Sequence, residues 1–362
     1  KCCRYSRISR PMNEEFSKFS DAIQHPKNGP FIIAEMSGNH NQSLSKALEI
    51  VDAAADAGAD AIKLQTYTPD TMTLDIESGD FVINDPNSLW FKENMYSLYN
   101  KAHTPWEWHK PILERANKRG LVCFSSPFDE TAVDFLETLD VPAYKIASFE
   151  CIDLPLVRKV ASTGKPLIIS TGMATLVEIA EAVDIARSSG CVDLTLLKCT
   201  STYPSSPKET NLRTIAHMQE LFGCEVGLSD HTRGIGVSVA AVALGATVIE
   251  KHFTLDREDG GVDSSFSLEP EELANLVTET ERAWQALGQI KYAPSTSEKS
   301  ARLRRRSLYI VNNMESGEIL TSDNLRRIRP GYGLPPKYYD TLLGKKICKS
   351  VEKGTPMSWD LL

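Results

Sequence analysis

The chain has 362 residues, of which 41% are hydrophobic and 24% are charged. This composition is typical of a globular enzyme with room for one domain of roughly 250 residues and a smaller second domain. The net charge of −8, from 40 Lys and Arg against 48 Asp and Glu, argues against a nucleic-acid partner, which needs a basic face. No apolar run approaches the roughly 20 residues that cross a bilayer, which excludes a membrane-spanning protein.

The start of the chain and its cysteines indicate the compartment in which the protein works. Its opening residues, KCCRYSRISR, are basic, but no apolar stretch follows them, so they do not form a secretory signal. We interpret residues 1–28 as a mostly irregular leader. The eight cysteines show no CxxC pair, and most lie within apolar segments, as buried thiols do in reduced compartments. The sequence therefore predicts a cytoplasmic protein.

From residue 31 onward, short apolar runs alternate with segments of helical apolar spacing. The runs predict eight strands, at residues 31–35, 61–65, 121–124, 143–147, 167–170, 193–197, 225–228 and 246–252. Eight strands, each followed by a helix, is the count of a (β/α)8 TIM barrel, whereas a doubly wound sheet normally stops at five or six. We assign residues 29–290 to this α/β barrel.

Three further segments interrupt or follow this alternation. Residues 66–105, which include Trp90 and several other aromatic residues, are far too long for a simple connection. Because they follow the second strand, we expect them to cover the mouth of the barrel. Residues 291–300 are polar and predict a linker. Residues 301–362 alternate short apolar runs with turns and predict a small β-rich domain, in which the basic run 304–306 is interpreted as a solvated face.

Catalytic groups of TIM barrels come from the carboxyl ends of the strands. The predicted ends carry many polar residues, namely Glu35, Lys63, Gln65, Ser126, Lys145, Ser148, Glu150, Ser170, Ser201, Tyr203, Ser229, His231, Glu250 and His252. The period of two along a strand places Lys63 and Gln65 on one face, and likewise Glu250 and His252. A barrel built for stability alone does not need such a cluster.

Each of these groups has more than one interpretation. Lys63 and Lys145 could be surface groups, anion ligands or a Schiff-base nucleophile. His231 and His252 taken singly are more often structural, but they end consecutive strands, so their imidazoles would lie side by side and suit a divalent transition metal. The segment from Ser170 to Gly172 could be a simple turn or a cradle for phosphate. These residues alone predict a barrel enzyme with an anion site and a metal site.

The strand ends also carry a series of longer motifs. They are AEMSGNHNQSL (34–44), KLQTYTPDTM (63–72), SSPFD (125–129), YKIASFE (144–150), ISTGMA (169–174), LLKCTSTYP (196–204), GLSDHT (227–232), EKHFT (250–254) and GVDSSFSLEP (261–270). With these motifs in order, the chain resembles the sialic acid synthase family over about residues 30–362. The resemblance implies a TIM barrel, a C-terminal antifreeze-like (SAF) domain with an RPG motif, and the condensation of phosphoenolpyruvate with an amino-sugar aldehyde.

The resemblance also implies roles for individual residues. Phosphoenolpyruvate would be held by Lys63, Ser126, Lys145, Ser148, Ser170, Ser201 and Ser229. The sugar would face Glu35, Gln65, Tyr203, Asp263 and Arg329, the last from the partner subunit of a homodimer in which the C-terminal domain covers the partner's active site. Glu150 would lie at the reacting centre, with Glu35 as a second catalytic carboxylate. His231 and His252 would bind a divalent metal, usually Mn²⁺, with Mg²⁺ or Co²⁺ as alternatives. Ser201 departs from the pattern, because related enzymes have Asn there in CTNxYP.

Within the family, MSGNHNQ and GVDSSFSLEP resemble the branch that makes pseudaminic acid. The implied sugar is 2,4-diacetamido-2,4,6-trideoxy-L-altrose, and the branches that make legionaminic or N-acetylneuraminic acid are the alternatives. A 6-deoxy sugar needs apolar contacts, for which Met36, Tyr67 and Phe266 are candidates.

Two alternatives come from other functional classes. A Schiff-base pyruvate aldolase would need no metal, which the two strand-end histidines argue against. A non-enzymatic ice- or sugar-binding protein would leave the polar strand ends without a purpose.

Overall fold

The computed structural model describes residues 19–23, 29–86 and 88–362. The chain divides into two compact units, Lys1–Gly288 and Gln289–Leu362. The irregular leader predicted for residues 1–28 lies outside the described residues except for residues 19–23, which are helical. Residues 291–300, the predicted linker, form bends and turns.

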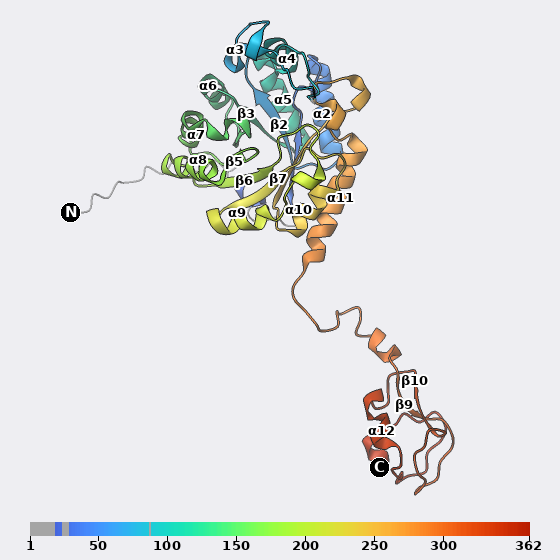
Figure 1. The fold of residues 1–362 in the computed structure, drawn as a ribbon. Helices are drawn as coiled ribbons and strands as arrows, with labels where there is room; N and C mark the ends of the chain where they lie inside the picture. Colours follow the sequence, from blue (N-terminus) through green and yellow to red (C-terminus); the bar gives the residue numbers. More distant parts are fainter. Residues whose placement is uncertain (1–18, 24–28, 87) are drawn as a thin grey trace, which may run out of the picture. The chain divides into compact units, whose positions relative to one another are not determined.

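The first unit is a closed barrel of eight parallel strands, in which each strand pairs with the next and β1 also pairs with β8 (Figure 1). The strands are β1 (Phe31–Glu35), β2 (Ala61–Thr66), β3 (Val122–Pro127), β4 (Tyr144–Ile146), β5 (Leu167–Ser170), β6 (Leu194–Cys199), β7 (Glu225–Ser229) and β8 (Val248–His252). The predicted TIM barrel is confirmed, and every strand lies within three residues of its expected bounds.

Helices surround the barrel (Figure 1). They are α2 (Leu44–Asp56), α3 (Pro69–Met72), α4 (Met95–Ala102), α5 (Trp106–Arg119), α6 (Glu130–Thr138), α7 (Leu154–Ala161), α8 (Leu176–Ser188), α9 (Thr214–Phe222), α10 (Gly236–Ala243) and α11 (Pro270–Leu287). Several begin at a side chain that caps the first turn; Asp129, for example, accepts a hydrogen bond from the Ala132 amide, 2.7 Å away. No helix in the described part of the chain combines the length and apolarity needed to cross a bilayer.

Both faces of the barrel strands are buried, which explains why the strands are nearly continuous apolar runs. In β1, Phe31 and Ile33 point into the barrel, whereas Ile32 and Ala34 pack against the surrounding helices. Met36 continues the outward alternation and is fully buried in the same layer as Ile32. The structure therefore does not bring Met36 to the barrel mouth, and the expected contact with the sugar was assigned to the wrong face.

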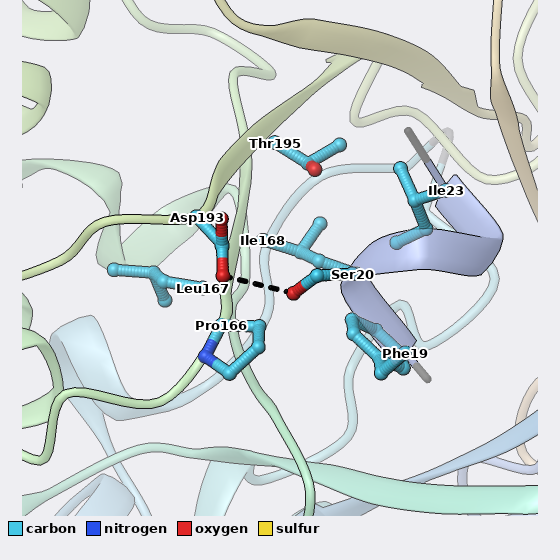
Figure 2. Close-up of a pocket in the computed structure, with 8 residues that line it drawn as sticks. All are labelled: Phe19, Ser20, Ile23, Pro166, Leu167, Ile168, Asp193 and Thr195. Atoms are coloured by element: carbon cyan, nitrogen blue, oxygen red, sulfur yellow. Dashed lines mark hydrogen bonds between the residues drawn. The ribbon is translucent and has the colours of Figure 1, made fainter. Parts of the chain in front are cut away.

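The amino-terminal end of the barrel is closed by residues 19–23 (Figure 2). The ring of Phe19 lies edge-on to Phe31 and Phe124, with centroids 5.4 and 5.5 Å away. Ser20 Oγ donates a hydrogen bond to Asp193 Oδ2, 2.9 Å away. The cavity beside this segment is about 10 Å³, which is room for one water molecule at most. A substrate therefore has no room at this end.

The connection between β2 and α5 contains α3 and α4 and reaches across to the segment after β8. Its aromatic residues are ordered by contacts: Tyr67 lies edge-on to Tyr99 and Phe128, with ring centroids 5.8 and 5.2 Å away. Trp90 Nε1 donates a hydrogen bond to the Val262 carbonyl oxygen at 3.1 Å. This bond ties the connection to the segment that leads into Asp263.

The second unit has its own apolar core, which includes Leu308, Ile310, Leu325, Leu342 and Met357. Two antiparallel strands, β9 (Ser307–Ile310) and β10 (Leu325–Ile328), lie beside the short helix α12 (Tyr339–Leu342). Isolated bridges such as Met314 to Val351 connect its turns. Arg329 directly follows β10 and is exposed.

Candidate active site

Two buried ion pairs lie side by side inside the carboxyl-terminal end of the barrel. Lys63 pairs with Glu35, its register partner on the neighbouring strand, and Lys145 Nζ lies 3.1 Å from Glu250 Oε1. All four residues are between 1% and 4% exposed. Burial of charges is costly unless they are paired and hydrogen-bonded, so a site with four of them needs a functional reason.

Hydrogen bonds complete this arrangement. Gln65 Nε2 donates to Glu35 Oε1 at 2.8 Å, Lys63 Nζ donates to Ser126 Oγ at 3.3 Å, and Ser229 Oγ donates to Glu250 Oε1 at 3.0 Å. Burial alone would lower the pKa of Lys63, but the carboxylates of Glu250 and Glu35 raise it above its usual value. A lysine held protonated in this way is unsuited to Schiff-base formation, which requires a neutral amine.

Glu250 is a member of this site that the sequence prediction left without a role. Its carboxylate contacts Lys145 and Ser229, and its Oε2 atom is buried with no hydrogen-bond partner in the described part of the chain. The signal was present in the sequence, because Glu250 shares its strand face with His252. Only the pairing with Lys145, from a strand far away in the sequence, reveals its position in the site.

The two histidines lie together as expected from consecutive strand ends. The ring centroids of His231 and His252 are 5.3 Å apart. His231 Nδ1 lies 2.9 Å from the Thr200 carbonyl oxygen, whereas His252 Nδ1 is buried with no hydrogen bond to any described residue, 3.7 Å from Asp263 Oδ2. Burial and the nearby cationic groups lower the pKa of His252 well below its usual value, which leaves the ring neutral.

A neutral imidazole with a free nitrogen is the form that binds a divalent metal. Within the described ranges, no three or more His, Cys, Asp or Glu side chains are grouped so as to hold a metal ion. The two imidazoles fit a catalytic metal whose other positions are left to water and substrate, rather than a closed structural site.

Two serine hydroxyl groups, those of Ser148 and Ser201, lie close to Gly172. The Gly172 amide donates to Ser148 Oγ at 3.2 Å, and a Cβ atom at Gly172 would overlap Ser201 Oγ and lie 2.8 Å from Ser148 Oγ. Ser170, at the end of β5, has a buried Oγ atom with no hydrogen-bond partner among the described residues. A buried hydroxyl without a partner is expected where a ligand supplies the missing acceptor.

Carboxylates and aromatic rings surround the remaining side of the site. Glu150, in the short helical turn Phe149–Ile152, has a buried Oε2 atom with no hydrogen-bond partner within the described ranges, and burial raises its pKa to about 7. The Tyr203 ring lies 4.4 Å from His231, and Phe266 lies 5.0 Å from His252, between ring centroids. Asp263 accepts a hydrogen bond from Ser37. Burial raises the pKa of Asp263 although the Ser37 bond lowers it.

The structure thus gathers most of the expected site residues at one end of the barrel. Arg329 differs, because it belongs to the second unit. Tyr67 is 2% exposed and packs among aromatic residues of the β2–α5 connection.

Comparison with known proteins assigns the chain to a family. A family model described as the NeuB family matches residues 50–292, and a SAF domain model matches residues 305–362. The chain belongs to the NeuB family. Its C-terminal unit contains the expected SAF domain.

Named relatives cover nearly the whole chain. The pseudaminic acid synthase of Campylobacter jejuni serotype O:2 is 47% identical over 90% of this chain and 94% of its own length. The Helicobacter pylori pseudaminic acid synthase is 44% identical over 91% of this chain and 97% of its own. The N,N'-diacetyllegionaminic acid synthase of the same Campylobacter strain is only 37% identical, over 89% of this chain and 97% of its own.

A solved structure supports the same assignment. The N-acetylneuraminic acid synthetase from Leptospira borgpetersenii, crystallised with citrate, is similar with a TM-score of 0.68 and 35% sequence identity. The match covers 76% of this chain and 90% of the other. The family consists of sugar acid synthases, so the barrel is that of an enzyme.

Proposed function

We propose that the chain is a pseudaminic acid synthase, which condenses phosphoenolpyruvate with 2,4-diacetamido-2,4,6-trideoxy-L-altrose and releases phosphate. The choice of sugar is supported by the difference in identity to two relatives from one strain, 47% for the pseudaminic and 37% for the legionaminic acid synthase. The choice of reaction is supported above all by one observation, the pair of buried lysines Lys63 and Lys145, which lie beside serine hydroxyls at the mouth of the barrel. Together they suit a small molecule that carries both a phosphate and a carboxylate.

Lys63 and Lys145 hold the two anionic groups of phosphoenolpyruvate in this proposal. The hydroxyl groups of Ser126, Ser148, Ser170, Ser201 and Ser229 complete the cradle. A chain with a net charge of −8 attracts such an anion only through local cations focused in a cleft. Glu35 and Glu250 neutralise these lysines when the anion is absent.

The electrophile is the sugar aldehyde. An enol phosphate is a weak carbon nucleophile, so the aldehyde must be polarised. His231 and His252 would hold a divalent cation, Mn²⁺ in the first instance and Mg²⁺ or Co²⁺ as alternatives, which supplies Lewis-acid polarisation when bound. Gln65, Tyr203 and Asp263 orient the sugar from neighbouring strand ends.

Glu150 acts at the reacting centre. Bond formation between C3 of phosphoenolpyruvate and the aldehyde carbon leaves positive character at C2, which a nearby carboxylate stabilises. Glu150 is our first candidate for this role and Glu35 the second, since Glu35 already pairs with Lys63. Water then adds to C2, and the tetrahedral intermediate expels phosphate by cleavage of the C2–O bond.

The enzyme works as a homodimer in which the C-terminal unit, with Arg329, covers the partner's active site. Residues 289–362 contain 14 Lys and Arg against 7 Asp and Glu, a net charge of +7, whereas residues 1–288 contain 26 against 41, a net charge of −15. Opposite charge of this size favours docking of one unit type on the other. Phe149, Ile152 and Met173 are exposed apolar side chains near Glu150 and Gly172 that docking would cover.

We place the reaction in the cytoplasm. The six described cysteines are free, and four of them are buried, as expected for thiols that are kept reduced.

The deciding experiment measures phosphate release from phosphoenolpyruvate with Mn²⁺ and either the diacetamido-altrose or N-acetylmannosamine. We expect release with the diacetamido sugar and far slower release with N-acetylmannosamine. A preference for N-acetylmannosamine would keep the family but refute the proposed substrate.

The bond that breaks is tested with ¹⁸O in the bridging C–O position of phosphoenolpyruvate. Cleavage of C2–O predicts that the label appears in phosphate. Label found in water or retained in the sugar acid would refute this route.

The crossed dimer is tested by co-expressing two inactive variants, Arg329→Ala and Lys145→Met. If the C-terminal unit acts on the partner's barrel, each mixed dimer contains one intact site and activity returns. Activity that stays at the level of the separate variants would show that each unit serves its own barrel.

A further inference from the structure

Trp90 is a residue of the β2–α5 connection to which no role has been given above. Its indole is half-buried, and its ring centroid lies 5.8 Å from that of Tyr203 with the planes tilted by 56°. Its Nε1–H donates to the carbonyl of Val262 at 3.1 Å, so the only polar atom of the side chain is already satisfied. The ring face and edge are therefore held in a fixed position as apolar surface.

This indole extends an arc of rings that begins at the two histidines. From His231 the centroid distance to Tyr203 is 4.4 Å, and Tyr203 in turn lies 5.4 Å from Phe266. Trp90 is the member of the arc furthest from the histidines, because it contacts Tyr203 and no ring contact joins it to either imidazole among the described residues. The Val262 carbonyl that fixes it immediately precedes Asp263, which faces the same space.

The substrate is long enough to reach from the histidines toward this position. The aldehyde carbon of the sugar must lie beside the histidines if they hold the cation that polarises it. An open chain of six carbons spans about 6 Å, given C–C bonds of about 1.5 Å. A sugar that extends from an aldehyde at His231 along the Tyr203 ring brings C5 and C6 toward Trp90.

We propose that Trp90 is a specificity-determining residue that packs against the 6-deoxy end of the sugar. This inference rests on the proposed function and names one side chain that selects the substrate. A methyl group at C6 packs on the indole without loss of a hydrogen bond. A hydroxyl group at C6 is pressed against carbon atoms, because the indole N–H is already donated to Val262.

The size of this selection follows from general experience with apolar pockets. A pocket that merely buries a methyl group distinguishes ligands by about 10- to 200-fold and rejects an added hydroxyl group by about 100-fold. Trp90 is one wall among several, so its removal should cost a part of this factor.

The test compares the wild-type enzyme with Trp90→Ala, Trp90→Phe and the control Leu89→Ala. Leu89 is the preceding residue in the same segment and is 47% exposed. For each enzyme, kcat and KM are measured for the diacetamido-altrose, for N-acetylmannosamine and for phosphoenolpyruvate. Thermal unfolding shows whether each variant is folded.

We expect Trp90→Ala to lower kcat/KM for the diacetamido sugar by about 10-fold or more, and to change the value for N-acetylmannosamine much less. The KM for phosphoenolpyruvate should stay at the wild-type value. A general disturbance of the barrel mouth would instead raise this KM. Trp90→Phe keeps an apolar ring but loses the bond to Val262. Its preference for the diacetamido sugar should therefore lie between that of the wild type and that of Trp90→Ala. Leu89→Ala should behave as wild type.

Two results would overturn the inference. One is an unchanged ratio of kcat/KM between the two sugars in folded Trp90→Ala. The other is an equal loss for both sugars together with a raised KM for phosphoenolpyruvate, which would make Trp90 a structural residue. The proposed substrate is tested separately, because it is the wild-type enzyme that would refute it, by preferring N-acetylmannosamine.

Discussion

The two ends of the barrel are built from the same eight strands, yet they differ in almost every physical property. At the amino-terminal end, Phe19 and Ile23 fill the opening with apolar side chains and leave about 10 Å³ of space. At the carboxyl-terminal end, four charged residues are buried together, and Ser170, Glu150, Glu250 and His252 each have a buried polar atom that has no hydrogen-bond partner among the described residues.

This difference separates stability from function within one fold. Apolar packing lowers the free energy of the folded state and needs no ligand to do so. Unpaired polar atoms raise that free energy, and a group of them in one place is expected where a ligand completes them. Variants at the mouth should therefore lose activity while the fold stays intact, and variants at the closed end should lose stability while kcat stays unchanged.

The largest expected effect on activity is at the histidines. His252→Ala should lower kcat/KM by about 10³-fold or more, since Lewis-acid polarisation contributes several kcal/mol to the rate. Phosphate release measures the activity, and calorimetric titration with Mn²⁺ measures the loss of metal affinity. His217→Ala, an exposed histidine on α9, is the control and should leave both unchanged. Wild-type metal affinity in His252→Ala would contradict the assignment.

Glu150→Gln should lower kcat by about 10²-fold, because the amide cannot stabilise positive character at C2. The pKa of about 7 predicts that wild-type activity falls as pH drops through 7, with a limb that Glu150→Gln lacks. Because burial raises the pKa of Glu150 in the folded state, its protonated carboxyl stabilises the fold at low pH, and this contribution is lost as pH rises through about 7. The variant should thus unfold at a higher temperature than wild type at pH 8, and this difference should vanish at pH 4.

Phe19→Ala tests the closed end. Loss of a buried ring that contacts Phe31 and Phe124 should lower the free energy of unfolding by about 3 kcal/mol, as measured by denaturant titration. At a temperature where the variant is folded, kcat and both KM values should equal those of wild type. A fall in kcat under those conditions would show that the two ends of the barrel are coupled.

Ser20→Ala should have the smallest effect, about 1 kcal/mol, because it removes a single hydrogen bond to Asp193. The same denaturant titration measures it. Activity should not change, and a larger loss than in Phe19→Ala would contradict the view that apolar packing closes this end.

Much of the barrel could be predicted because its signal is local. Strands buried on both faces are short apolar runs, and the strands at residues 31–35 and 167–170 match β1 and β5 at both ends. The β4 strand is shorter than its apolar run, since only Tyr144–Ile146 pairs with its neighbours in the barrel. The run itself does not reveal where pairing stops.

The site was predictable as a set of strand ends and not as a set of contacts. The pairing of Lys145 with Glu250 and the position of Trp90 beside Val262 depend on which distant strands and loops meet. Met36 is a predicted contact that the structure does not show. It follows Glu35 directly, and the alternation of side chains along the strand turns it toward the helices. The helical residues 19–23 are too few for a periodic pattern, so their place in the barrel end could not be foreseen.

Gly172 limits how this site can change over evolutionary time. The hydroxyl groups of Ser148 and Ser201 occupy the volume that any side chain at position 172 would need. A larger residue at 201, such as the Asn of CTNxYP, has to project away from Gly172 or displace Ser148. Evolutionary change at position 201 is therefore not independent of its neighbours, because an Asn there either points away from Gly172 or requires the hydroxyl groups around Gly172 to rearrange.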